Sequence, residues 1–127
     1  RIQRVYALVN CGFPEDGING EALRVVESFS RAVGARWRFG LMLGGGGMLL
    51  GAKDAPFMKN VRAEIDAFFS LVSEDVRAQS EQARETFHAS IQFPRRLYFL
   101  MGNFGWAMQA RRYRLKKRDL YKRPYRP

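Results

Sequence analysis

Two apolar runs, each followed at once by glycine-containing sequence, dominate the pattern at the start of the chain. The first run spans 5–9 and precedes the segment 10–15, Asn-Cys-Gly-Phe-Pro-Glu; the second spans 37–43 and precedes four successive glycines, Gly44–Gly47. One helix-length amphipathic stretch lies between them. Buried parallel strands appear in sequence as near-continuous apolar runs, and a helix usually connects them. The pattern therefore predicts a strand, a helix and a second strand of a parallel α/β sheet.

The stretch between the two runs carries apolar residues at helical spacing. They recur every three or four positions: Ala22, Val25, Val26, Phe29, Ala32 and Val33. Such a stripe is typical of a helix that covers a sheet. Asn19 is the expected N-cap, and Glu21 lies in the first turn, where the helix dipole favours a negative charge. The second run alternates apolar residues with Arg36 and Arg38, so we expect its strand to lie nearer the sheet edge than the first.

Less regular sequence follows the glycine run. A second apolar stripe comes after Pro56, which suits a helix start, and consists of Val61, Ile65, Phe68, Phe69 and Val72. The segment 73–92 is polar and weakly periodic, and leaves open whether this helix continues or breaks. Pro94 opens an aromatic segment, 95–108, in which two glycines interrupt the helical pattern. We thus expect two strands, and a stable open sheet normally needs three or more. The chain is therefore expected to be the C-terminal part of a larger α/β domain, with partner strands from another chain as the alternative.

Positive charge is concentrated in the last quarter of the chain. Residues 1–94 hold eleven basic and eleven acidic side chains, whereas residues 95–127 hold eleven basic side chains and one acid, Asp119. We divide the chain accordingly into the C-terminal half of an α/β domain, 1–94, and an aromatic and basic C-terminal extension, 95–127. Such a cluster can contact phosphate of nucleic acid, lipid or nucleotide, and we expect anionic surface contact through Arg111–Arg126. The alternative is a solvated helix face and tail.

Composition and spacing exclude several kinds of site. Cys11 is the only cysteine, so no intramolecular disulfide can form and we expect a reducing, cytoplasmic environment. The only histidine, His88, has no cysteine or histidine at metal-ligand spacing, and we predict no metal site. The two longest uncharged stretches, 39–52 and 97–110, have 14 residues each, fewer than the roughly 18 that a membrane-spanning helix needs. The sequence shows no pair of acidic residues of the kind that acid–base catalysis uses, and we therefore name no catalytic residue.

Both glycine-containing segments follow a predicted strand, and ligands of open α/β folds bind outside the carboxyl ends of the strands. Gly12 allows a ligand to approach the backbone closely, and Phe13 can lie against a flat ring. The four successive glycines cost backbone entropy and match neither the dinucleotide-binding nor the P-loop spacing. The structural alternatives are a simple strand-to-helix connection at 10–15 and a flexible or tightly packed turn at 44–47. We interpret Cys11 as a buried, inert thiol.

Several motifs together resemble one known family. The segments 5–15 and 44–48 are similar to the later half of flavodoxin-like NAD(P)H-dependent oxidoreductases of the FMN reductase type. The segments 101–106, Met-Gly-Asn-Phe-Gly-Trp, and 115–121, Leu-Lys-Lys-Arg-Asp-Leu-Tyr, resemble the C-terminal end of uncharacterised bacterial members. The resemblance spans nearly the whole chain. It implies a flavodoxin-like three-layer fold with five parallel strands in the order 2-1-3-4-5, of which this chain supplies the last two strands and their helices.

The resemblance also implies a function. FMN would bind at the carboxyl edge of the sheet, and the protein would transfer electrons from NAD(P)H to an acceptor that the sequence does not identify. The implied cofactor-binding residues are Asn10, Cys11, Gly12 and Phe13, which would border the isoalloxazine ring, and Gly44, Gly45, Gly46 and Gly47 on the same edge. The family's Ser/Thr-rich phosphate loop and its third-strand loop do not occur in these residues, so FMN binding is expected of the complete domain. We also expect a homo-oligomer. The alternative is a non-enzymatic binding module that uses its basic C-terminal segment on nucleic acid or an anionic membrane.

Overall fold

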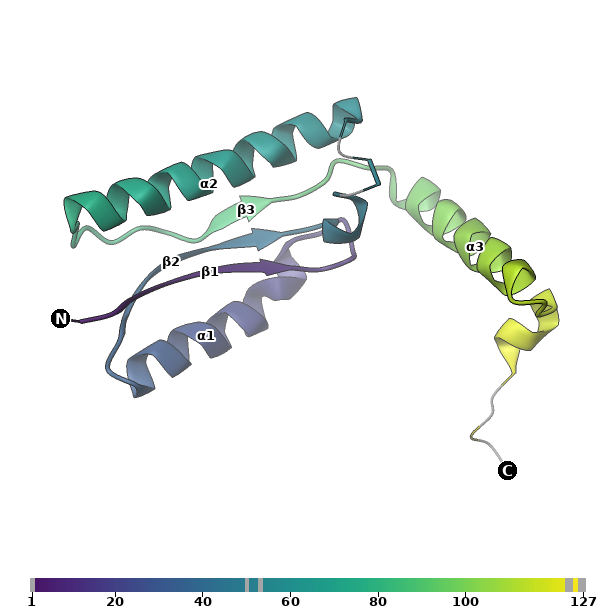
Figure 1. Cartoon of the computed structure of the whole chain (residues 1–127), viewed down its shortest axis with the longest axis horizontal. Helices are drawn as coiled ribbons and strands as arrows, with labels where there is room; N and C mark the ends of the chain where they lie inside the picture. The colour runs from purple at the N-terminus through teal and green to yellow at the C-terminus, as the bar shows by residue number, and fades with distance from the viewer. Residues whose placement is uncertain (1, 50, 53, 123–124, 126–127) are drawn as a thin grey trace. The chain divides into compact units, whose positions relative to one another are not determined.

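The computed structural model describes residues 2–49, 51–52, 54–122 and 125. The chain forms two compact units, Arg1–Gln92 and Phe93–Pro127. The first unit contains, in chain order, β1 (Arg4–Asn10), α1 (Gly20–Ala32), β2 (Arg36–Leu43), α2 (Lys59–Ala78) and β3 (Phe87–Ala89) (Figure 1). Short 3-10 turns precede both helices. The second unit contains α3 (Arg95–Arg112) and a 3-10 turn, η4 (Lys117–Tyr121).

The first unit is built around a sheet of three parallel strands in the order β1-β2-β3. Helices α1 and α2 lie on opposite sides of this sheet (Figure 1). Leu23 of α1 packs against Gly40, whereas Phe68 of α2 meets Phe39 edge-on, with 5.8 Å between ring centroids. Successive residues of a strand face opposite sides of the sheet, which agrees with this arrangement. The predicted α/β class with a parallel sheet is confirmed.

Two features of the sheet differ from the sequence prediction. A third strand, β3, pairs with residues 41–43, where the pattern predicts only two strands, because three residues give too little periodicity to stand out from a polar segment. The central strand is therefore β2, and the prediction that it lies nearer the edge than β1 is wrong. Arg38, which suggested an edge, is only 7 % exposed because a carboxylate of α2 neutralises it.

The core of the first unit lies between the sheet and α2. Its fully buried apolar side chains are Phe39, Leu41, Leu43, Met58 and Val61. The ring of Phe87 lies against Phe39 and Phe68, with centroids 5.7 Å and 6.2 Å apart. Each such side chain stabilises the fold by about 1.5–3 kcal/mol when it is fully buried. The apolar stripe predicted for α2 is only partly buried, because Phe69 is 54 % exposed.

The apolar stripe of α1 is mostly exposed. This helix buries Leu23 and Ser30, whereas Val25 and Phe29 are 67 % and 63 % exposed and the C-cap residue, Val33, is 57 % exposed. Its N-cap residue is Asn19, as predicted, but the Asn19 side chain makes no capping hydrogen bond. The side-chain amide donates instead to the carbonyl oxygen of Leu43, at 3.0 Å. The spacing thus locates the helix but does not identify the side that contacts the sheet.

Strand β1 has the composition of a central strand but lies at an edge. Within the described part of the chain it pairs with β2 alone. Its apolar residues are half-buried or exposed, and Leu8 is 37 % exposed. Parallel sheets are normally covered on both faces, and their strands are correspondingly apolar. The outer row of backbone N–H and C=O groups of β1 therefore has no sheet partner among the described residues.

In the second unit, α3 runs without interruption through Gly102 and Gly105. The prediction that these glycines interrupt the helix is wrong, since each costs only about 1 kcal/mol in a helix interior. None of the helices in the described residues combines the length and apolar character required to cross a membrane. Of the predicted basic segment Arg111–Arg126, residues 123, 124 and 126 lie outside the described residues.

Candidate functional site at the carboxyl edge of the sheet

The carboxyl ends of β1 and β2 bring the two glycine-containing segments into direct contact. The backbone N–H of Gly45 donates to the carbonyl oxygen of Phe13 at 2.5 Å, and that of Gly46 donates to the carbonyl oxygen of Cys11 at 2.8 Å. In the other direction, the N–H of Cys11 donates to the carbonyl oxygen of Leu43 at 3.1 Å. These hydrogen bonds continue the pairing of β1 with β2 beyond the strands and fix the segment 10–16 across the end of β2.

Three of the four glycines lie close to other parts of the chain. A Cβ atom on Gly44 would lie 2.0 Å from the carbonyl oxygen of Pro14, and one on Gly46 would lie 2.9 Å from the side chain of Asn10. Gly45 has a φ of +75°, and its Cβ atom would lie 2.1 Å from the side chain of Ile91. Gly47 differs, because no atom lies within 4 Å of its Cβ position. At the first three positions, the group that lies close to the glycine backbone is therefore another part of the chain, not a ligand.

The N–H groups of these glycines are also engaged within the chain. Gly44 donates to the carbonyl oxygen of Ala89 at 2.8 Å, so Gly44, Gly45 and Gly46 all donate to backbone carbonyl groups. A phosphate cradle needs several backbone N–H groups that point at the ligand. These three N–H groups hold strand ends and loops together instead.

The segment 10–13 presents a different surface to solvent. Asn10 and Gly12 are exposed and Phe13 is 51 % exposed. Beyond its two chain neighbours, no atom lies within 4 Å of the Cβ position of Gly12, so the space above this residue is open. Cys11 is half-buried, not buried as predicted, and its Sγ lies 3.4 Å from the carbonyl oxygens of Phe13 and Glu15. An exposed ring beside accessible backbone is a surface on which a planar ligand can stack.

An aspartate, a histidine and a serine form a cluster beside this edge. The Asp16 carboxylate contacts Nδ1 of His88 and accepts a hydrogen bond from the hydroxyl of Ser90, whose oxygen accepts from the Asp16 N–H at 3.3 Å. Burial acts to raise the pKa of Asp16, but the hydrogen bonds from Ser90 and His88 outweigh it and hold that pKa below its ordinary value. The His88 side chain is 58 % exposed. The cluster fastens the loop after β1 to the end of β3.

This cluster is not predicted from the sequence, where His88 lies in a polar segment. A short signal is present, because residues 87–91 read Phe-His-Ala-Ser-Ile and alternate as a strand does. That alternation puts His88 and Ser90 on one face of β3 and its extension. Asp16 reaches the same face from another loop, and only the tertiary structure brings it there.

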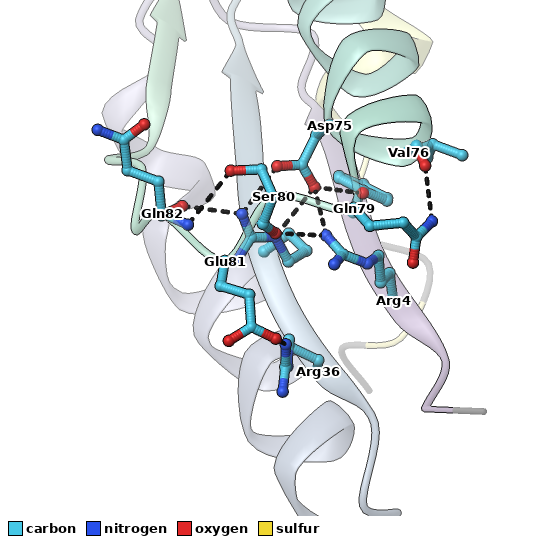
Figure 2. A network of polar contacts seen from close by, with 10 residues as sticks. Arg4, Arg36, Asp75, Val76, Gln79, Ser80, Glu81 and Gln82 are labelled. Atoms are coloured by element: carbon cyan, nitrogen blue, oxygen red, sulfur yellow. Dashed lines mark hydrogen bonds and ion pairs between the residues drawn. The ribbon is translucent and has the colours of Figure 1, made fainter.

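A second polar cluster is buried at the amino end of the sheet, opposite the glycine segments (Figure 2). The Asp75 carboxylate of α2 has no exposed surface. It accepts hydrogen bonds from Arg38 at 3.0 Å and 2.8 Å, from the Tyr6 hydroxyl at 2.6 Å and from Arg4 at 3.0 Å. The two arginines also donate to backbone carbonyl groups of the segment 80–82. This network ties β1, β2 and the segment before β3 to the end of α2, which is a structural role.

The lowered pKa of Asp75 makes the free energy of unfolding depend on pH. Hydrogen bonding from Arg38, supported by Tyr6, outweighs burial and lowers this pKa from 3.8 to about 2. A group whose pKa is lowered by folding contributes stability above its unfolded-state pKa, and this contribution is lost as the pH falls through the folded-state value. We expect urea denaturation to show a loss of about 2 kcal/mol between about pH 5 and about pH 2. Asp75→Asn should lack most of this decline, and an unchanged decline in that variant would contradict the assignment.

Within the residues that the structure describes, no group of three or more His, Cys, Asp or Glu side chains could hold a metal ion. The chain matches no known family model, no curated protein and no solved structure. These comparisons identify no flavodoxin-like reductase family. The structure shows a parallel α/β sheet and the contact between the segments 10–15 and 44–47 at its carboxyl edge.

Proposed function

We propose that the protein is a flavin-dependent oxidoreductase that binds the isoalloxazine ring of FMN at the carboxyl edge of β1 and β2. Electrons would pass from NAD(P)H to an acceptor that remains to be identified. The observation that supports this most is the exposed surface of Asn10, Gly12 and Phe13. Hydrogen bonds from the backbone of the glycine run fix this segment in place. Ligands of open α/β folds bind at this edge of the sheet.

The residues at this edge fit the ring of FMN but not its phosphate. Phe13 offers a flat apolar surface, Gly12 is exposed with open space at its Cβ position, and the Asn10 amide can both donate and accept hydrogen bonds. The N–H groups of Gly44, Gly45 and Gly46 already donate within the chain, so the phosphate requires a part of the protein other than these groups. In this proposal the three glycines support the site, and exposed Gly47 is the member of the run that a ligand can reach.

FMN would supply the redox chemistry when bound. The residues of this chain would orient the ring and cover one of its faces, while the nicotinamide cofactor and the electron acceptor would use the other face. Exposed apolar residues of α1 and its C-cap support the further proposal that the protein is a homo-oligomer: Val25, Phe29 and Val33.

Titration with FMN and with riboflavin, followed by quenching of flavin fluorescence, tests the ring site. We expect the two flavins to bind this chain with Kd values within about threefold, because the glycine N–H groups do not hold the phosphate. Phe13→Ala should weaken binding about tenfold, since stacking of an aromatic side chain on a planar base is worth about 1–3 kcal/mol. Oxidation of NADH or NADPH in the presence of FMN then distinguishes an enzyme from a protein that only binds flavin.

Phe69→Ala provides the matched control, because it removes an aromatic ring that is 54 % exposed on α2, outside the segments 10–13 and 44–47. This variant should bind flavin as the wild type does. An absence of quenching by either flavin at about 1 mM, which corresponds to binding weaker than about 4 kcal/mol, would refute the ring site. Equal weakening by both alanine substitutions would do the same.

A further inference from the structure

Helix α3 carries an exposed apolar stripe along one side. Each member lies three or four residues from another member, which puts the five side chains on one face of the helix. They are between 41 % and 65 % exposed: Leu97, Leu100, Met101, Phe104 and Met108. The opposite side carries Gly102 and Gln109 together with two aromatic residues, Phe99 and Trp106, which are 48 % and 65 % exposed. Within the described part of α3 only Ala110 is buried, so the apolar stripe of α3 remains open to solvent.

Basic side chains lie at both ends of this stripe. Arg95 and Arg96 begin the helix and Arg111 and Arg112 end it; all four are exposed, and the helix contains no acidic residue. The following residues to 122 add further basic side chains against a single acid, Asp119, whose carboxylate is 2.7 Å from the Lys122 ammonium. The surface around the stripe is therefore strongly positive.

We propose that the apolar stripe of α3 binds the surface of an anionic phospholipid bilayer, with the helix lying in the plane of the headgroups. Leucine, methionine and phenylalanine would leave water for the boundary between headgroups and acyl chains, and the arginines at both ends would meet anionic headgroups. The uncharged part of the helix is too short to span the bilayer, which leaves an in-plane orientation. This membrane contact is independent of the flavin site.

The arrangement of charge favours a bilayer over nucleic acid. A helix that binds nucleic acid places its arginines and lysines along the face that meets the phosphates. In α3 the middle of that face is occupied by Leu100 and Phe104, each 65 % exposed, and the arginines are confined to the ends. Contact with phosphates alone would leave this apolar surface in water.

Co-sedimentation of the full chain with vesicles tests the proposal. One set of vesicles contains phosphatidylcholine alone, and the other contains about 30 % phosphatidylglycerol, which supplies the negative surface charge. We expect binding to the anionic vesicles to be at least about tenfold tighter and to weaken as salt is raised. Replacing two stripe residues together, Leu100→Ser with Phe104→Ser, should weaken binding to anionic vesicles about tenfold or more.

A second pair of substitutions and a control test whether the arginines account for binding to anionic vesicles. Arg111→Gln with Arg112→Gln should weaken binding to anionic vesicles and leave binding to neutral vesicles unchanged. Phe69→Ser replaces an aromatic residue that is 54 % exposed on α2 and should have no effect. All substituted side chains are exposed, and circular dichroism verifies that each variant retains its helices.

Several results would overturn the proposal. The wild type could fail to sediment with anionic vesicles, or the Leu100→Ser and Phe104→Ser pair could bind them as tightly as the wild type. Tighter binding to a single-stranded oligonucleotide than to vesicles, unaffected by that pair, would assign the basic surface to nucleic acid. A dimer detected by light scattering, and lost in the same pair of substitutions, would assign the stripe to a second copy of the chain.

Discussion

Asp75→Asn is expected to destabilise the first unit by about 3–5 kcal/mol. The buried Asp75 carboxylate accepts four hydrogen bonds and is the partner of two guanidinium groups, those of Arg4 and Arg38. An asparagine side chain accepts through one oxygen only and carries no charge, so Arg38 would remain buried without its counter-ion. The expected loss is a large fraction of the ~5–15 kcal/mol by which small domains are stable. Urea denaturation followed by circular dichroism measures it.

Asp66→Asn is the matched control for this substitution. It makes the same chemical change in the same helix, α2, at an exposed position. Surface substitutions of this kind normally change stability by no more than about 0.5 kcal/mol. If Asp75→Asn cost as little as Asp66→Asn, the carboxylate would not be the centre of a buried network.

The second large effect is expected for Gly44→Ala, which should cost about 3 kcal/mol. The added Cβ atom would lie 2.0 Å from the carbonyl oxygen of Pro14 and 2.9 Å from the backbone nitrogen of Asp16. Both are backbone atoms, so no rotation of a side chain relieves the collision and the segment 10–16 has to move. We therefore expect lower stability in urea and faster amide hydrogen exchange at residues 11–16.

Gly47→Ala tests whether the effect comes from crowding or only from the loss of a glycine. Nothing lies within 4 Å of the Cβ position of Gly47, and the residue belongs to the same glycine run. We expect this variant to match the wild type to within about 0.5 kcal/mol. Equal losses in both variants would mean that the segment 10–16 does not cross the end of β2 as closely as described.

The main elements of the first unit follow from the sequence because their signals are local. The runs 5–9 and 37–43 lie within β1 and β2, and the two helical stripes lie within α1 and α2 except for Val33, the C-cap of α1. The order of the strands depends on partners that are distant in the sequence. In the sequence, Arg38 indicates an exposed strand. In the structure, its charge is neutralised by Asp75, which lies 37 residues later in the chain. Strand β3 has only three residues, so its pairing with β2 is visible only in three dimensions.

The sequence predicts where the candidate site lies, but it does not predict the contacts that its residues make. The segments 10–13 and 44–47 each follow a strand, which is sufficient to place both at the carboxyl edge. The sequence does not distinguish glycines that approach a ligand from glycines that approach the chain itself. That distinction depends on Pro14 and Ile91, which pack against Gly44 and Gly45. The pairing of Asp16 with His88 depends in the same way on a loop that crosses two strands.

The edge position of β1 has a consequence for how the strand is held. Neighbouring peptide groups of a strand point in opposite directions, so a strand with one partner uses only every second group for pairing. The middle of β1 therefore has about half the backbone hydrogen bonds of a central strand. Its two ends are secured by other means, Arg4 by the Asp75 carboxylate and Cys11 by the backbone of Leu43 and Gly46. Local opening should therefore begin at the centre of β1, around Ala7, while both ends stay in place.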